Sequence, residues 1–81
     1  MAVGDRSKAR RALNVLGEHP GVIAGTLVDP DEAPSGCWTV EVVIDAYAIP
    51  PRILRTLADH DLAVRQSGSH NDHVRVIASV V

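Results

Sequence analysis

The stretch from Cys37 to Tyr47, CWTVEVVIDAY, decides the fold class. Its residues alternate between two kinds of side chain with the period of two that a β-strand imposes. Such alternation is typical of a strand that packs on a core with one face only, as in antiparallel sheets. The mainly apolar face holds Trp38, Val40, Val42, Ile44 and Ala46, and the other face holds Thr39, Glu41, Val43, Asp45 and Tyr47.

Three further segments have the composition of strands. They are GVIAGTLVD (21–29), LAVRQS (62–67) and HVRVIASVV (73–81), and the turn-forming residues GSHND (68–72) separate the last two. PDEAPSG (30–36) is expected to be a loop because it contains two prolines and a glycine. The inward-facing side chains are expected to be Leu62, Val64, Val74, Val76, Ala78 and Val80.

The segment DRSKARRALNVLGEHPG (5–21) predicts the first of two helices. Asp5 or Ser7 is expected to cap its start, and Gly17 or the following His-Pro-Gly group is expected to end it. Its apolar residues recur at helical spacing on one face, and they are Ala9, Ala12, Leu13 and Leu16.

The segment IPPRILRTLADH (49–60) predicts the second helix. Pro50 or Pro51 suits its first turn, where a missing N–H costs nothing. The inward face is expected to carry Ile53, Leu54 and Leu57, and the outward face Arg52 and Arg55.

The order α-β-β-α-β-β predicts a single α+β domain over residues 1–81. We expect a two-layer sandwich, in which both helices cover one face of a four-stranded, mainly antiparallel sheet. A ferredoxin-like β-α-β-β-α-β chain would give the same order if its first strand were moved to the end. This topological analogy implies no function, since many unrelated activities share that fold.

Composition excludes several functional classes. The formal net charge of −2 provides no global basic field for nucleic acid or anionic lipid. The single Cys37 argues against a disulfide-stapled secreted scaffold, and no apolar run reaches the roughly 18–20 residues that span a bilayer. A cytoplasmic protein without membrane association is expected. With one Trp, one Tyr and no Phe, the core is aliphatic, and a second copy of the chain could add burial.

Histidines and aspartates are frequent between Asp59 and Val76. A strand over 62–67 would separate His60 from the later residues by about 20 Å, too far for ligands of one ion. His70, Asp72 and His73 remain as a candidate metal site in the turn. Their spacing matches no strong metal signature, so a solvated turn is favoured, and His60 is expected to interact with a helix dipole.

Catalysis is not expected, and no cofactor is predicted. A general base requires a partner and a pocket, and a domain of this size offers little room for one. Cys37 begins a strand, and the sequence alone places no histidine beside it.

The first helix carries a local basic face, formed by Lys8, Arg10 and Arg11, that could contact phosphates. It supports an alternative function as a nucleic-acid-binding accessory protein. The sheet lacks the aromatic residues that stack bases, so nucleic acid is disfavoured as a partner.

The outward sheet face mixes aliphatic side chains with opposite charges. Such a surface can pair with a twofold-related copy, or it can be solvated and hold cross-strand ion pairs. We therefore expect a small non-enzymatic interaction or regulatory module that associates through its sheet, as a homodimer or with a protein partner. The candidate interaction residues are Thr39, Glu41, Val43, Asp45, Arg65, Arg75 and Ile77.

Overall fold

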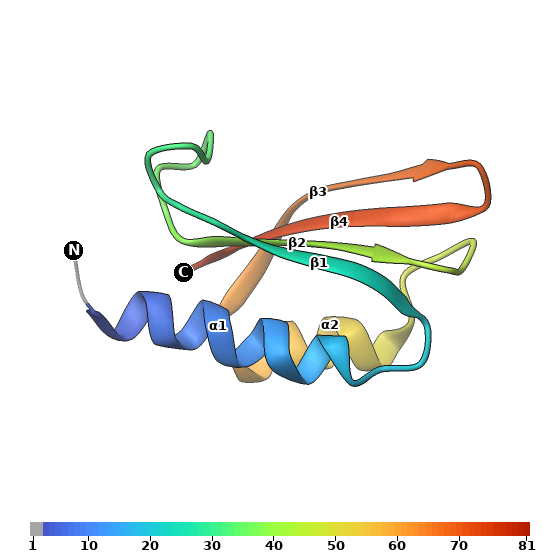
Figure 1. Ribbon diagram of the computed structural model, residues 1–81, viewed down its shortest axis with the longest axis horizontal. Helices are drawn as coiled ribbons and strands as arrows, with labels where there is room; N and C mark the ends of the chain where they lie inside the picture. The colour runs from blue at the N-terminus through green and yellow to red at the C-terminus, as the bar shows by residue number, and fades with distance from the viewer. Residues whose placement is uncertain (1–2) are drawn as a thin grey trace.

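The computed structural model describes the backbone of residues 3–81 and the side chains of residues 5–69 and 71–81. Its elements follow the predicted α-β-β-α-β-β order, as Figure 1 shows. They are α1 (Val3–Gly17), β1 (Val22–Val28), β2 (Thr39–Ile44), α2 (Pro51–Asp59), β3 (Leu62–His70) and β4 (His73–Val80).

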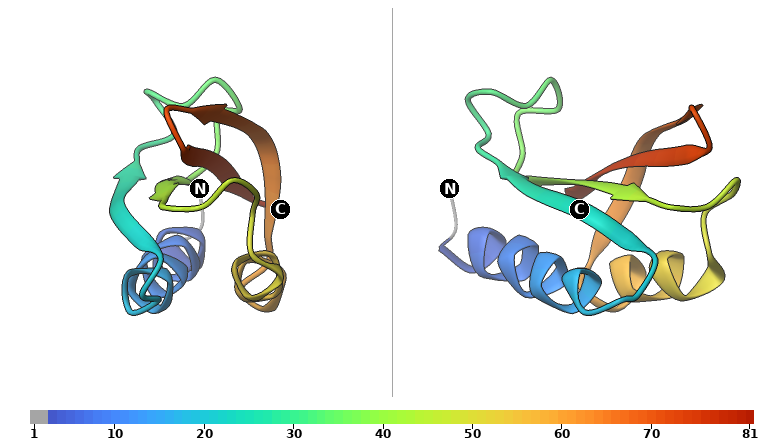
Figure 2. Two further views of the ribbon diagram at one scale, coloured as in Figure 1. Left: turned by 90° about the vertical axis from the view of Figure 1, so that its right-hand side faces the viewer. Right: turned by 45° about the vertical axis from the view of Figure 1, so that its right-hand side comes forward.

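The strands form one antiparallel sheet in the order β1-β2-β4-β3. Both helices lie on the same side of this sheet (Figures 1 and 2). The opposite side is called the open face below, and within residues 3–81 only the β1–β2 loop (29–38) folds over it. The predicted α+β two-layer sandwich is therefore confirmed.

The core lies between the sheet and the helices. The β2 residues Val40, Val42 and Ile44 are fully buried, as the alternation of that strand predicts. Ala9, Ala12 and Leu16 supply the buried face of α1, and the small alanines allow the helix to approach the sheet. The other buried apolar side chains include Ile53, Leu57, Leu62, Val74, Val76, Ala78 and Val80.

Gly25 shows how closely α1 packs on β1. A Cβ atom at this position would lie 2.7 Å from Cδ1 of Leu13. The glycine therefore leaves space that the leucine fills, which is one recognised use of glycine within a strand.

Three local predictions are wrong in detail. Helix α1 begins at Val3, so Asp5 and Ser7 lie inside it and neither caps its start. Leu54 is 43% exposed, because only Ile53 and Leu57 of α2 face the core. Val64 pairs with Ala78 but is 38% exposed, since it lies on an edge strand.

The β3–β4 hairpin is longer than the sequence suggested. Strand β3 continues to His70, and only Asn71 and Asp72 form the turn. Both turn residues have positive φ, 47° and 68°, as a two-residue type I′ hairpin requires. Asn and Asp tolerate this conformation better than most residues, so a pair of them can replace the more usual Asn-Gly.

Within residues 3–81, no helix is both long enough and apolar enough to cross a membrane.

Candidate interaction surface on the open face of the sheet

The sheet register brings most of the proposed interaction residues together on the open face. Glu41 of β2 pairs with Ile77 of β4, and Val43 pairs with Arg75. These side chains alternate with the buried ones and therefore point away from the helices. Asp45 is exposed beyond the end of β2, where its N–H donates to the carbonyl of Gly21.

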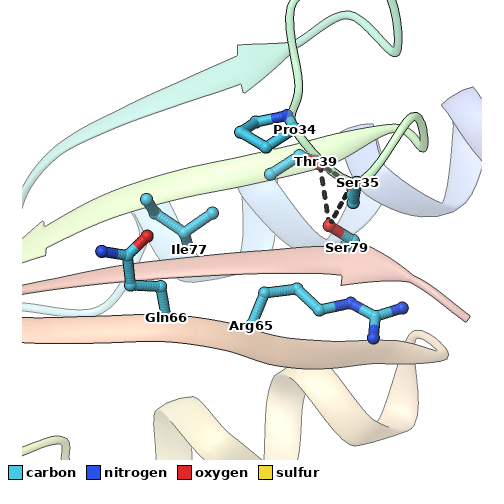
Figure 3. A pocket seen from close by; sticks show the side chains of 7 residues that line it. All are labelled: Pro34, Ser35, Thr39, Arg65, Gln66, Ile77 and Ser79. Atoms are coloured by element: carbon cyan, nitrogen blue, oxygen red, sulfur yellow. Dashed lines mark hydrogen bonds between the residues drawn. The ribbon is translucent and has the colours of Figure 1, made fainter.

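Arg65 lies on the open face as the alternation from Leu62 and Val64 predicts, and an irregularity in β3 brings Gln66 to the same face. The pairing of β3 with β4 shifts between Val64 and Gln66, which leaves Arg65 as an extra residue. In such a bulge two residues oppose one on the neighbouring strand. Gln66 therefore lies beside Ile77, and the Arg65 side chain extends along the sheet toward the Ser79 end of the same hollow, as Figure 3 shows.

One cross-strand ion pair spans the centre of the open face. The Arg75 Nε donates to Oε1 of Glu41 at 2.8 Å, and the Arg75 Nη2 lies 2.7 Å from the same oxygen. The two residues are diagonal neighbours, since Glu41 lies opposite Ile77 and Val43 lies opposite Arg75. The pairing restricts the Arg75 side chain, although 59% of that side chain remains exposed.

Three hydroxyl groups join the β1–β2 loop to the end of the sheet. The Oγ1 of Thr39 lies 2.9 Å from the Oγ of Ser79, and the Oγ of Ser79 lies 3.0 Å from that of Ser35 (Figure 3). Thr39 and Ser79 are only 2% and 1% exposed, although both belong to the face that the helices leave open. The loop therefore covers one end of that face.

The direction of these hydrogen bonds follows from the groups at the two ends. The Thr39 hydroxyl donates to the carbonyl of Cys37 at 2.9 Å, since a carbonyl only accepts. Thr39 must then accept from Ser79, and Ser79 must accept from Ser35. The Ser35 Oγ in turn accepts from the N–H of Cys37 at 3.3 Å. The chain of bonds begins and ends on the backbone of one residue, Cys37.

This hydroxyl ring, made by Ser35, Thr39 and Ser79 with the backbone of Cys37, is best understood as a structural clamp. Each hydroxyl proton is already used inside it, so it offers lone pairs and no free donor to an anion. Sequence reasoning missed Ser35 and Ser79, because Ser79 meets Ser35 only through the strand order. A polar residue at an outward strand position carries no signal that a distant loop will cover it.

Three shallow hollows follow one another along β4 on the open face, and together they are called the trough below. They have volumes of about 460, 430 and 390 Å³, and neighbouring hollows share Gln66, Ile77 or Arg75. The trough begins beside Pro34 and Ser35 and ends beside Asn71 and His73. Its other lining residues are Thr39, Val43, Arg65, Ser67, Gly68, Ser69 and Ser79.

The histidines are separated along the chain as expected. His60 follows the last turn of α2, and its Nδ1 lies 2.8 Å from the carbonyl of Thr56, so a ring N–H can satisfy that carbonyl. The nine-residue strand β3 then separates it from the hairpin turn.

Of the proposed metal residues, Asp72 lies in that turn, and His70 and His73 flank it. The Nδ1 of His73 lies 2.7 Å from the carbonyl of Asn71, a bond in which the ring must donate. The side chain of His70 lies outside the described residues. Among the described residues, no three His, Cys, Asp or Glu side chains gather closely enough to hold a metal ion.

The basic residues of α1 do not form one continuous free surface. Lys8 pairs with Asp61 at 3.3 Å, and the guanidinium of Arg6 lies 5.8 Å from the ring centre of Trp38. Arg10 and Arg11 are exposed. Two of these cations are therefore engaged within the chain, and Arg10 and Arg11 would have to carry most of any contact with phosphates.

Cys37 is half-buried, and its Sγ lies 3.7 Å from the carbonyl of Ser35 within the same loop.

Comparison with known proteins gives no relative for this chain: no family model matches it, and no similar curated protein or solved structure was found. The ferredoxin-like relation therefore stays a topological prediction, and the function has to be argued from this chain alone.

Proposed function

We propose that this chain is a small non-enzymatic interaction or regulatory module that associates through its β-sheet, as a homodimer or with a protein partner. One observation carries the proposal. The three hollows of the trough follow one another along β4, on the face that the helices leave uncovered.

The shape of the trough suits an extended protein segment better than a compact small molecule. Small-molecule sites are enclosed cavities that bury most of the ligand, whereas these hollows follow one another along a strand. Ile77 and Val43 are half-buried and offer aliphatic contacts to a side chain of the partner. The exposed side-chain N–H groups of Arg75 and Gln66 can donate to backbone carbonyls of the partner.

The rigidity of the surface also favours binding. The Glu41 carboxylate holds Arg75, and the hydroxyl ring fixes the loop at the other end of the trough. A surface that is already ordered loses less conformational entropy when a partner binds.

The experiment compares two aliphatic positions on opposite sides of the molecule. The immobilised chain is used to select binders from a displayed random-peptide library, and the selected peptides are tested against Ile77→Lys and Leu54→Lys. Leu54 is the matched control, since it is exposed on α2. We expect Ile77→Lys to abolish binding and Leu54→Lys to retain it, with circular dichroism showing both variants folded. Equal loss in both variants, or no selected peptide, would contradict the proposal.

The nucleic-acid alternative has a separate test. The double charge reversal Arg10→Glu and Arg11→Glu would abolish salt-dependent binding to mixed DNA and RNA if that function were correct. No binding by the unmodified chain at low salt would remove the alternative.

A further inference from the structure

The outer edge of β3 is open over its distal half. β3 is the last strand of the sheet, with β4 as its single neighbour among residues 3–81. Figure 2 shows β3 at the side of the molecule, and every residue from Val64 to Ser69 is exposed. Unpaired strand edges present backbone N–H and C=O groups that can pair with another chain.

The hairpin geometry identifies which backbone groups point outward. His70 and His73 close the two-residue turn and therefore form a pair that exchanges both backbone hydrogen bonds. Such pairs alternate along an antiparallel ladder, so Gly68 and Gln66 also bond to β4. Ser67 and Ser69 consequently direct their N–H and C=O groups away from the sheet.

Gly68 has no evident role within its own chain. A Cβ atom at this position would meet nothing within 4 Å, and its φ is not positive. A glycine inside a strand weakens the strand, and it often marks a place where another backbone approaches closely. Since nothing among the described residues fills the space where a Cβ of Gly68 would lie, the approaching backbone would belong to another chain.

We propose that a second copy of this chain adds to the outer edge of β3 by antiparallel strand pairing, with the twofold axis passing beside Gly68. In this register Ser67 of each copy pairs with Ser69 of the partner subunit. Gly68 faces its own counterpart in the close pair that makes no backbone hydrogen bonds, where Cα atoms lie about 4.5 Å apart. The inference goes beyond the proposed function, since it places a second copy at the edge of β3, whereas the proposed function rests on the trough of the open face.

Charge complementarity supports this register. In this register the paired strand ends at His70 of the partner subunit, so Arg65 lies near the partner subunit's Asp72 in the turn that follows, and the twofold axis repeats the arrangement. Arg65 and Asp72 are both exposed, and among the described residues neither has an ion-pair partner. The bulge at Arg65 ends the regular part of the edge, so the paired segment is short.

The first test uses two substitutions at one residue. Ser67→Pro removes the outward N–H that the second copy needs, while the bonds of β3 to β4 are left in place because that N–H faces solvent in the monomer. Ser67→Ala removes only the hydroxyl. Sedimentation equilibrium over a concentration series should show a monomer–dimer equilibrium for the unmodified chain and for Ser67→Ala, and a monomer for Ser67→Pro. Circular dichroism checks that each variant is folded.

A second test does not depend on Ser67→Pro folding. Gly68→Cys is made together with Cys37→Ala, and mild oxidation is followed by non-reducing electrophoresis. A Cα separation of about 4.5 Å lies within the range of about 4.4–6.8 Å that a disulfide spans, so a covalent dimer should form readily. The matched control is Thr26→Cys, also with Cys37→Ala, on the exposed edge strand β1. Faster crosslinking from β1 would overturn the proposal in favour of the other edge.

The third test uses a double-mutant cycle to measure the coupling between Arg65 and the partner subunit's Asp72. Arg65→Glu should weaken the dimer by roughly two- to tenfold, because it brings two like charges together at each end of the interface. Asp72→Asn keeps a residue that tolerates positive φ. It should weaken the dimer of the unmodified chain but strengthen the dimer of the Arg65→Glu variant. If Asp72→Asn changed the dimer affinity in the same direction in both backgrounds, the register would be contradicted.

Failure of this inference can be told from failure of the proposed function. A strict monomer at millimolar concentration, or a dimer that survives Ser67→Pro, would overturn the β3 pairing. Peptide binding lost specifically in Ile77→Lys would still support the open face. Conversely, a dimer that Ser67→Pro abolishes stands even if no peptide binds the trough.

Discussion

Val42 and Val43 are neighbours on β2, yet they lie in different environments. Val42 is fully buried against the helices, whereas Val43 is half-buried on the open face. On the helix-covered face, apolar side chains exclude water by close packing. On the open face, the hydroxyl ring excludes water at one end, whereas the ion pair in the centre remains partly exposed. Burial on this sheet therefore depends on what covers a position. Side-chain polarity alone does not determine it.

The largest expected effect comes from truncating these two valines. Val42→Ala should lower the free energy of unfolding by about 2–3 kcal/mol, because it removes buried methyl groups and leaves a cavity. Val43→Ala should cost less than about 1 kcal/mol, since solvent already reaches that side chain. Urea denaturation of both variants measures the difference. Equal costs would show that something covers the open face as completely as the helices cover the other.

The hydroxyl ring gives the next largest effect. Thr39→Val keeps the shape of the side chain but leaves the carbonyl of Cys37 and the hydroxyl of Ser79 without their partner, at a cost of about 1–3 kcal/mol. Thr39→Ser keeps the ring and loses one methyl group, for about 0.8 kcal/mol. Denaturation midpoints give the free energies, and limited proteolysis reports release of the β1–β2 loop. If Thr39→Ser proved the more damaging change, packing and not hydrogen bonding would hold the loop.

At Gly68, in contrast to the preceding positions, a substitution is expected to raise the free energy of unfolding. In dilute solution, where association is weak, Gly68→Ala should stabilise the folded chain by about 0.5–1 kcal/mol. The alanine restricts the unfolded chain, and its Cβ meets no neighbour within 4 Å. Thermal unfolding at low concentration measures the change. Destabilisation there would mean that the glycine is required inside its own chain.

The smallest effect is expected for the ion pair on the open face. A double-mutant cycle with Glu41→Gln and Arg75→Gln should give a coupling of about 0.2–1 kcal/mol, since both side chains are partly exposed. Added salt should reduce that coupling, because exposed charges are screened. A coupling that did not change with salt would place the pair in a drier environment than its exposure indicates.

Much of the candidate surface could be predicted from local pattern. The alternation in CWTVEVVIDAY identified the two faces of β2, and the same rule placed Arg75 and Ile77 on the open side of β4. The same alternation placed Arg65 on that face, whereas Gln66 joins it through a bulge that the sequence does not reveal. The cap at the start of α1 and the extent of the hairpin turn were predicted wrongly, because short polar residues fit several local structures.

The sequence by itself determined the element order, the aliphatic core and the two faces of each central strand, because side-chain period is a local property of the backbone. Only the tertiary structure decided that Ser79 lies beside Thr39, that Glu41 pairs with Arg75, and that β3 forms an open edge. These contacts join residues far apart in the chain. They depend on strand order and register, which local propensity does not encode.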